Sequence, residues 1–272
     1  MGVTLKVGGD YWIDMSDYDF VLEVGSADIT TFTKTKIVGY ADGSKITITG
    51  SGFTADKYGY LVGGTVYSAQ ESYAGTVNIS LTGLNLSVQS LVKVFNTAST
   101  ADDLALVKSV LKGSDSLSGG SYADIIFGYD GNDKLYGKTG NDKLKGGAGD
   151  DKIHGGSGHD YLFGNSGKDT FIFKSVKDST VGSLGRDTIY DFQGSEGDKI
   201  DLSAIDANTK LADHQAFKFI GKEVFHKKAG ELRFDRKASD TFIFGDVDGD
   251  GKPDFAIHLD DALTFSKGHF LL

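Results

Sequence analysis

The sequence predicts an all-β protein that contains one short helix and a two-sheeted parallel β-roll. Three observations support this prediction. Runs of β-branched residues fill an N-terminal region, residues 1–98. Only the next segment, 99–112, has helical spacing. Residues 110–190 then repeat a nine-residue pattern, a period typical of parallel β-helical architectures. A C-terminal region, 191–272, completes the four predicted parts.

The N-terminal region is expected to be a small β-module. KITITG (45–50) and TVNISLTGLNLSV (76–88) predict strands, and Asp42-Gly43 and Gly63-Gly64 predict hairpin turns. The region is rich in Tyr and Phe, and we expect most of these rings to pack a small core. The alternative is that a few Tyr and Trp side chains form a surface platform for sugars.

The segment STADDLALVKSVL, residues 99–111, changes from strand to helical periodicity. Ser99 or Thr100 can serve as the N-cap. The apolar residues at helical spacing are Leu104, Leu106, Val107, Val110 and Leu111. We therefore expect a short amphipathic helix that covers the first turn of the repeats.

The repeats keep two positions in register over nine blocks. Position six is always aspartate: Asp115, Asp124, Asp133, Asp142, Asp151, Asp160, Asp169, Asp178 and Asp187. Position eight is apolar in every block but one, where Thr180 stands: Leu117, Ile126, Leu135, Leu144, Ile153, Leu162, Phe171 and Ile189. Both positions must therefore have fixed structural roles.

The block pattern predicts a loop of six residues followed by a strand of three. Glycines at positions one, two and four allow left-handed backbone angles in the loop. The position-eight side chain points inward, and alternate blocks lie on opposite sides, which builds two parallel sheets around an aliphatic core. Each block then stacks on the block two further along, and the aspartates form two columns, 115/133/151/169/187 and 124/142/160/178.

Stacked carboxylates repel one another unless a cation lies between them. A hard divalent ion that takes six to eight oxygen ligands fits this loop, and calcium tolerates its irregular geometry better than magnesium does. We expect about five to seven Ca²⁺ ions, whose binding drives folding. The alternative is a metal-free solenoid with acidic turns. The predicted ligands are the nine position-six aspartates and the position-one glycines Gly128, Gly137, Gly146, Gly155 and Gly164.

Two of the blocks, GGAGDDKIH (146–154) and GGSGHDYLF (155–163), resemble the calcium-binding nonapeptide of the RTX (repeats-in-toxin) family. Residues 182–206, 229–235 and 244–259 resemble the segment that follows such repeats in serralysin-type secreted proteins. The resemblance covers about residues 110–272. It implies a β-sandwich-like C-terminal domain that carries an uncleaved signal for the type I secretion machinery, with HFLL at the end of the chain. It also implies a secreted, extracellular protein that folds on calcium outside the cell.

A second acidic motif, DVDGDGKPD (246–254), lies in the C-terminal region. Its aspartates occupy positions 1, 3, 5 and 9 of a calcium loop: Asp246, Asp248, Asp250 and Asp254. Position 12 is Ile257 and not glutamate, so the motif is no EF-hand; it resembles the calcium hairpin of integrin β-propellers. One further ion is expected here, and the alternative is an acidic β-turn.

Composition excludes several classes of function. The net charge of −10 argues against a nucleic-acid partner, and the lack of cysteine excludes thiolate sites. No apolar run is long enough for a membrane span, and the start has no pattern of an N-terminal secretion signal. HExxH, GxSxG and CxxC motifs are absent, which predicts a protein without catalytic residues.

Three functions remain open at this point. The first is binding or adhesion, in which the N-terminal module contacts polysaccharide or a cell surface. The second is a membrane-active, cation-channel-type RTX protein. The third is a polysaccharide-modifying enzyme that uses two carboxylates, such as Asp14, Asp17 or Glu23, in the first hundred residues.

Overall fold

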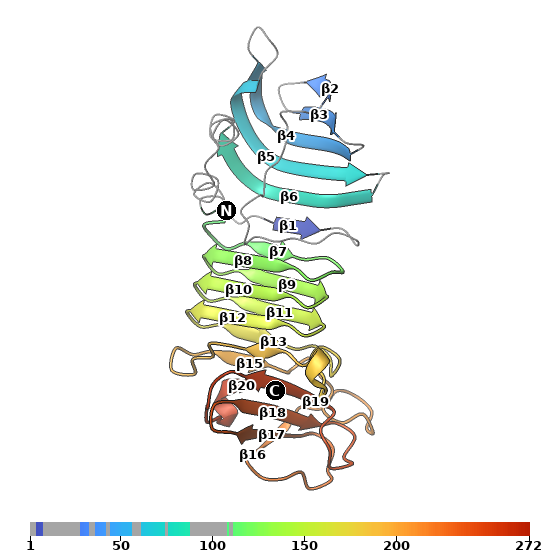
Figure 1. Ribbon diagram of the computed structural model, residues 1–272, viewed down its shortest axis with the longest axis vertical. Coiled ribbons are helices and arrows are strands. Elements are labelled where there is room, and N and C mark those ends of the chain that lie inside the picture. Colours follow the sequence, from blue (N-terminus) through green and yellow to red (C-terminus); the bar gives the residue numbers. More distant parts are fainter. Residues whose placement is uncertain are drawn as a thin grey trace.

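The computed structural model is elongated, and the N-terminal strands, the repeats and the C-terminal strands follow one another along its length (Figure 1). It describes residues 4–7, 28–32, 36–41, 44–55, 61–73, 76–87, 108 and 111–272. Most of the predicted helix at 99–111, and most side chains of the N-terminal module, lie outside the described residues. The prediction of an all-β chain is confirmed.

In the described part of the chain, six strands precede the repeats. They are β1 (Thr4–Val7), β2 (Asp28–Phe32), β3 (Lys36–Ala41), β4 (Ser44–Ala55), β5 (Leu61–Tyr73) and β6 (Thr76–Ser87). Strands β2 to β6 form an antiparallel meander. The predicted turn at Gly63-Gly64 is wrong, because both glycines lie within β5. The β4–β5 register shifts opposite them, which is how glycine within a strand often behaves.

Strand β1 joins the N-terminal meander to the repeats. It pairs antiparallel with β6 and parallel with β7 (Ser116–Ser118), the first strand of the roll. One sheet of twelve strands therefore runs through the molecule in the order β2-β3-β4-β5-β6-β1-β7-β9-β11-β13-β15-β20. The first four residues of the described chain thus cover an edge that the roll would otherwise expose.

The repeats form the predicted roll. Its further strands are β8 (Ile125–Asp130), β9 (Lys134–Thr139), β10 (Lys143–Ala148), β11 (Lys152–Ser157), β12 (Tyr161–Ser166) and β13 (Thr170–Ile172). Each strand pairs in parallel with the strand two further along, for example Leu144 with Ile126 and with Leu162. Alternate strands therefore belong to opposite sheets.

The core of the roll consists of the position-eight side chains. They are 0 to 1 % exposed: Leu117, Ile126, Leu135, Leu144, Ile153, Leu162, Phe171 and Ile189. Their neighbours on each strand are only partly buried or exposed, which gives the alternation of a sheet that has one face in the core. The sequence-based assignment of this position is confirmed.

The nine-residue register ends at Ile172, and the C-terminal strands then extend both sheets. These are β14 (Thr188–Ile189), β15 (Lys199–Asp201), β16 (Lys218–Gly221), β17 (Glu231–Arg236), β18 (Thr241–Asp246), β19 (Phe255–Leu259) and β20 (Phe270–Leu271), with short 3₁₀ turns at Ser183–Gly185 and Lys267–His269. Strand β15 pairs with β13 and β14 pairs with β12. The second sheet runs β16-β17-β18-β19-β14-β12-β10-β8.

Candidate calcium site

The loops of the roll use their glycines for two different reasons. Position four has the left-handed backbone that was predicted, with φ of +131° at Gly131 and +130° at Gly149. Position one does not. A Cβ on Gly146 would instead overlap the carboxylate of Asp151. The prediction of left-handed angles at position one is therefore wrong: glycine is needed there for space beside the aspartate.

Each aspartate of the roll holds the loop of an earlier block through one carboxylate oxygen. The backbone N–H of Asp133 donates to Oδ1 of Asp151 at 2.8 Å, and the N–H of Asp142 donates to Oδ1 of Asp160 at the same distance. Seven such hydrogen bonds run through the two columns. We call this arrangement the aspartate ladder. It accounts for only one oxygen of each carboxylate.

The other carboxylate oxygen is buried without a protein partner in six ladder residues. Within the described part of the chain, no hydrogen bond reaches Oδ2 of Asp133, Asp142, Asp151, Asp160, Asp169 or Asp187. None of the ion pairs among the described residues involves these six side chains either. A buried charged oxygen with no partner is strongly destabilising, so each of these atoms calls for a ligand.

Burial also makes these carboxyls difficult to ionise. It raises the pKa of Asp142 to about 8 and that of Asp133, Asp151, Asp160 and Asp169 to about 7, and neighbouring aspartates add to the effect. The pKa of Asp187 is raised well above its usual value, first by burial and then by Asp160. The protein atoms alone thus disfavour the charged form that a metal ion requires.

The space beside the position-one glycines Gly128 and Gly137 fits a hard cation. A Cβ on Gly128 would overlap Oδ2 of Asp133 and the carbonyl oxygen of Gly146 together, and one on Gly137 would overlap Oδ2 of Asp142 and the carbonyl oxygen of Gly155. The space is therefore lined by a carboxylate oxygen and by a backbone oxygen from two blocks further along. An all-oxygen donor set of this kind suits calcium.

Carboxylates alone do not complete such a site. The described residues contain two sets of three His, Asp or Glu side chains with donor atoms within 4.8 Å of one another, and neither set includes a ladder aspartate. An ion in the ladder would thus take part of its coordination from backbone carbonyls. Such carbonyls lie beside the position-one glycines Gly128 and Gly137. Beside the predicted ligands Gly146, Gly155 and Gly164, the nearest atoms belong to the following aspartate, so their part in the site stays a prediction.

The columns of aspartates end differently from the prediction. Asp187 follows Asp160, because Asp160 donates its N–H to Oδ1 of Asp187. Asp198 follows Asp169 in the same way. Asp178 lies outside the ladder, where its carboxylate accepts the N–H of Lys174 and lies 3.9 Å from Nδ1 of His154. The predicted stacking of Asp187 on Asp169 and of Asp178 on Asp160 is wrong.

Asp198 is the ladder residue that sequence reasoning missed. Lys199 and Ile200 follow it, just as Lys134 and Leu135 follow Asp133, so the repeated Asp-Lys-aliphatic triplet was a usable signal. The nine-residue count hid it, since Asp198 is 29 residues from Asp169 and the earlier steps are 18.

The predicted loop at 246–254 brings three of its four aspartates together. Donor atoms of Asp246, Asp248 and Asp254 lie within 4.8 Å of one another, and Asp250 is not part of this set. Backbone N–H groups already occupy these carboxylates. Gly249 and Gly251 donate to the two oxygens of Asp246, and Val247 donates to Asp254. The loop is thus internally hydrogen-bonded, and an ion here stays a prediction.

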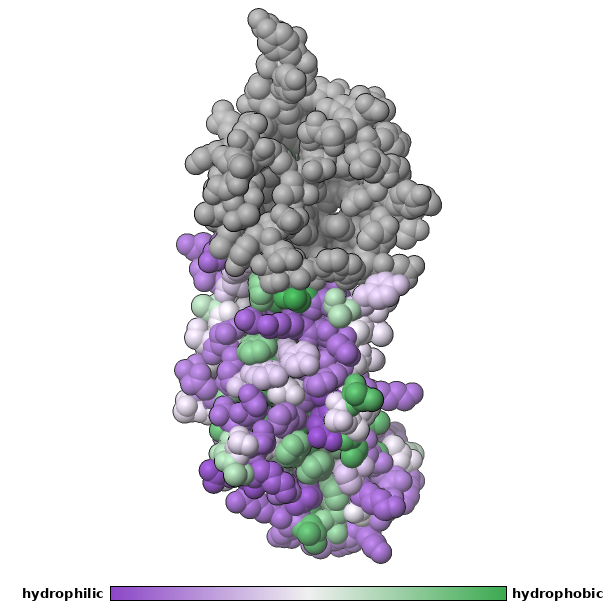
Figure 2. Space-filling model, in the orientation of Figure 1, coloured by the Kyte–Doolittle hydropathy of each residue, from purple (hydrophilic) through white to green (hydrophobic). Residues whose placement is uncertain are grey.

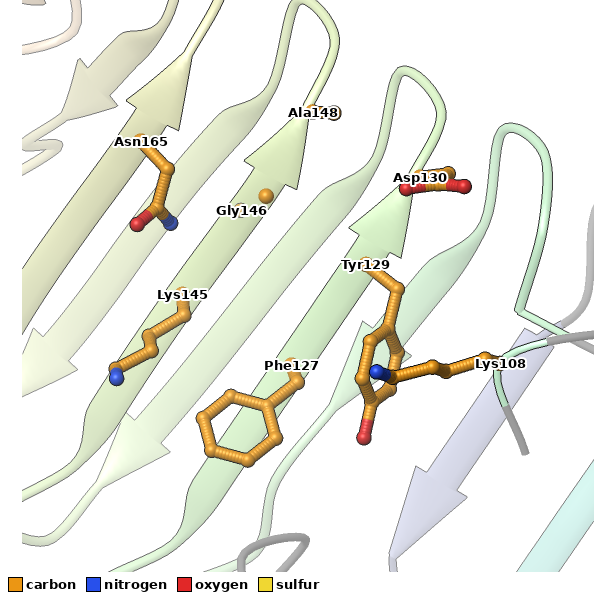
Figure 3. Close-up of a pocket in the computed structure, with 9 residues that line it drawn as sticks. Lys108, Phe127, Tyr129, Asp130, Lys145, Gly146, Ala148 and Asn165 are labelled. Carbon is orange, nitrogen blue, oxygen red and sulfur yellow. The ribbon is translucent and has the colours of Figure 1, made fainter. Parts of the chain in front are cut away.

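A cavity of about 590 Å³ lies on the outer face of the second sheet (Figure 3). Aromatic rings and ammonium groups meet there: Nζ of Lys145 lies 5.4 Å from the ring centre of Phe127, and Nζ of Lys108 lies 5.9 Å from that of Tyr129. Asp130 and Asn165 complete the polar lining. Gly147 also lines the cavity, between Tyr129 and Asn165 in the sheet.

Elsewhere on the visible face, hydrophilic side chains cover most of the described surface, and apolar ones form small separate patches (Figure 2). The large apolar side chains exposed in the described residues are Tyr122, Tyr161, Leu184, Leu211, Val224 and Leu271. Within the part of the chain that the structure describes, no helix has the length and apolarity needed to cross a bilayer.

Comparison with known proteins agrees with this architecture. The family model of the serralysin C terminus of peptidase family M10 matches residues 109–267, more than half of the chain. The chain therefore belongs to the serralysin C-terminal family. It carries RTX-type calcium-binding β-roll repeats.

Two similar solved structures are solution structures of subunits of a mannuronan C5-epimerase from Azotobacter vinelandii. The AlgE6R3 subunit is 28 % identical, with a TM-score of 0.25, over 59 % of this chain and 78 % of that one. The AlgE6R2 subunit is 23 % identical, with a TM-score of 0.34, over 59 % of this chain and 92 % of that one. A search of curated proteins found no match.

Proposed function

We propose that this is a secreted calcium-binding protein whose β-roll folds when calcium enters the aspartate ladder outside the cell. The observation that supports it is the set of six buried carboxylate oxygens without a protein partner. Unfolded, the same oxygens are hydrated, so the metal-free fold carries a desolvation cost that calcium removes. With seven steps in the ladder, five to seven ions can bind.

A calcium titration of the full chain tests this proposal. We expect far-UV circular dichroism to show a cooperative gain of β-structure at roughly 0.1–1 mM calcium, the range of extracellular modules. Magnesium at the same concentration leaves the signal unchanged, because it demands near-ideal octahedral geometry. Calorimetry should count five to seven ions per chain. A roll that is fully folded in chelator contradicts the proposal.

Secretion is the second part of the proposal. The family membership favours a C-terminal signal for type I export, and a roll that unfolds without calcium would remain able to thread an exporter in calcium-poor cytosol. Co-expression with a type I exporter should release the intact chain into the medium. A chain that lacks its last residues, Phe270 to Leu272, should stay inside the cell if they belong to the signal. Equal export of both chains contradicts this assignment.

The adhesion hypothesis places polysaccharide binding on the N-terminal module; we further propose that the cavity on the roll binds an acidic polysaccharide. Ammonium groups of Lys108 and Lys145 would pair with uronate carboxylates, and the rings of Phe127 and Tyr129 offer apolar surface to sugar rings. Lys145→Gln should weaken binding of an oligouronate about tenfold. The control is Lys152→Gln on the opposite sheet. Equal binding by both variants and the parent chain contradicts a site in this cavity.

The remaining two hypotheses have direct assays. Leakage of calcium-treated liposomes would reveal a membrane-active protein, and release of reducing ends or unsaturated products from polyuronates would reveal an enzyme. We expect neither activity. The N-terminal side chains that either activity would use lie outside the described residues.

A further inference from the structure

One histidine and two aspartates meet on the outer face of the C-terminal strands. Donor atoms of Asp240, His258 and Asp260 lie within 4.8 Å of one another. His258 is on β19, Asp260 follows the end of β19, and Asp240 immediately precedes β18. Antiparallel pairing of these strands, with Phe242 opposite His258, brings the three side chains together.

The imidazole of His258 is held so that Nε2 faces the carboxylates. Its Nδ1 lies 3.1 Å from Oγ1 of Thr188 on the neighbouring strand β14. Its ring stacks on Phe242, with centroids 4.9 Å apart and planes at 25°. Nε2 then lies 3.0 Å from Oδ1 of Asp240. A hydroxyl on Nδ1 fixes the ring in the way that outer contacts fix metal-binding histidines.

We propose that Asp240, His258 and Asp260 bind a divalent transition metal ion, with Zn²⁺ as the natural probe. One imidazole nitrogen and two carboxylate oxygens form a three-residue donor set of the kind that zinc accepts, with a further position open to water. When the ion is bound, Nδ1 of His258 carries the proton and donates a hydrogen bond to Oγ1 of Thr188. Calcium takes oxygen ligands, so this site and the aspartate ladder differ in metal class.

The simplest competing explanation is an ordinary hydrogen bond between His258 and Asp240 that ties the strands together. The chain contains a comparison for it at His226. There Nδ1 lies 2.9 Å from Glu231 and Nε2 lies 3.3 Å from Glu223. The two carboxylates contact opposite ring nitrogens, so they cannot converge on one ion. His226 thus has similar residue types without the convergent geometry.

The experiment is a Zn²⁺ titration of the calcium-loaded full chain by isothermal calorimetry, with Co²⁺ absorption as a second readout. We expect one Zn²⁺ per chain that excess calcium does not displace, and Co²⁺ bands that report a nitrogen ligand. His258→Asn and Asp260→Asn should each weaken binding at least about tenfold, whereas His226→Asn leaves it unchanged. Because Asp260 is exposed, its variant tests the site even if His258→Asn disturbs the packing on Phe242.

Three results would overturn the proposal. One is the absence of saturable Zn²⁺ binding by the parent chain. The other is unchanged affinity in Asp260→Asn and His258→Asn variants that retain the calcium-loaded circular dichroism spectrum. A loss of affinity confined to His226→Asn would move the site elsewhere and also overturn it.

Discussion

The aspartate ladder and the 246–254 loop both consist largely of aspartates and glycines. They differ in whether the carboxylate oxygens have hydrogen-bond partners in the protein. In the loop, backbone N–H groups occupy both oxygens of Asp246. In the ladder, Asp151 has one hydrogen-bonded oxygen and one buried oxygen without a protein partner. The difference shows that an acidic, glycine-rich motif does not itself require an ion. The requirement arises where stacking buries an oxygen that the chain cannot satisfy.

Removal of calcium should give the largest difference between the two regions. In chelator at neutral pH we expect the roll to lose most of its β-structure, because six buried carboxylate oxygens lose their only charge partner. Hydrogen exchange monitored by mass spectrometry can follow both regions at once. Hydrogen-exchange protection of residues 115–170 that persists in chelator would contradict the predicted difference between the ladder and the loop.

In the absence of calcium, acidification should partly restore the stability of the folded ladder. In the folded, metal-free ladder the pKa of Asp133, Asp151 and Asp169 is about 7, against 3.8 for the ordinary group. The folded state therefore binds more protons than the unfolded state. The contribution of these protonated carboxyls to the free energy of unfolding is fully present below about pH 4 and is lost as the pH rises through 7 to 8. In chelator, the β-signal of the roll in far-UV circular dichroism should therefore be present near pH 4 and be lost by pH 8.

Calcium should reverse this pH dependence, because its ligands must be deprotonated. Over the same range the apparent calcium affinity should rise with pH. A circular dichroism signal in chelator that does not change between pH 4 and pH 8 would show that the ladder carboxyls are not buried as described.

A single neutralised carboxylate should act in opposite directions under the two conditions. Asp151→Asn keeps an acceptor for the N–H of Asp133 but removes the charge. With calcium, the variant should be less stable by about 3 kcal/mol, because it loses a charged ligand. In chelator it should be more stable than the parent chain. Asp150→Asn is the control, since Asp150 is exposed and next in sequence.

A methyl group at position one should disturb the ladder without any change of charge. The Cβ of Gly146→Ala would overlap the carboxylate of Asp151. We expect a loss of about 1–3 kcal/mol, as for other overpacked sites, together with weaker calcium binding. Ala148→Ser on the exposed side of the same strand should change neither quantity. Unchanged calcium affinity in Gly146→Ala would show that Gly146 does not contribute to the calcium site.

The smallest effect is expected in the 246–254 loop. Asp250 lies outside the set of converging aspartates, so Asp250→Asn should change stability by less than about 0.5 kcal/mol. The number of calcium ions counted by calorimetry should also stay the same. A count lower by one would show that the loop binds an ion and that Asp250 is a ligand.

The structure of the repeat region was predictable because every block places the same residue types at the same positions of a loop and a strand. Asp151 and Ile153 keep their positions in the block, and the stacking of identical blocks determines which side chain enters the core. The prediction failed where the insertion at 173–187 breaks the count. Pairing follows strand position and not residue number, so Asp187 and Asp198 took the places assigned to Asp178 and Asp187.

The sequence by itself determined the β-roll, the aliphatic core and the aspartates of the ladder up to Asp169, because a periodic pattern specifies both its strands and their neighbours. Only the tertiary structure determined which elements and side chains come together at each end of the roll. It placed β1 between the N-terminal meander and the roll. It also brought Asp240, His258 and Asp260 together. No period relates these contacts, since they arise from the pairing of strands that are far apart in sequence or joined by irregular loops.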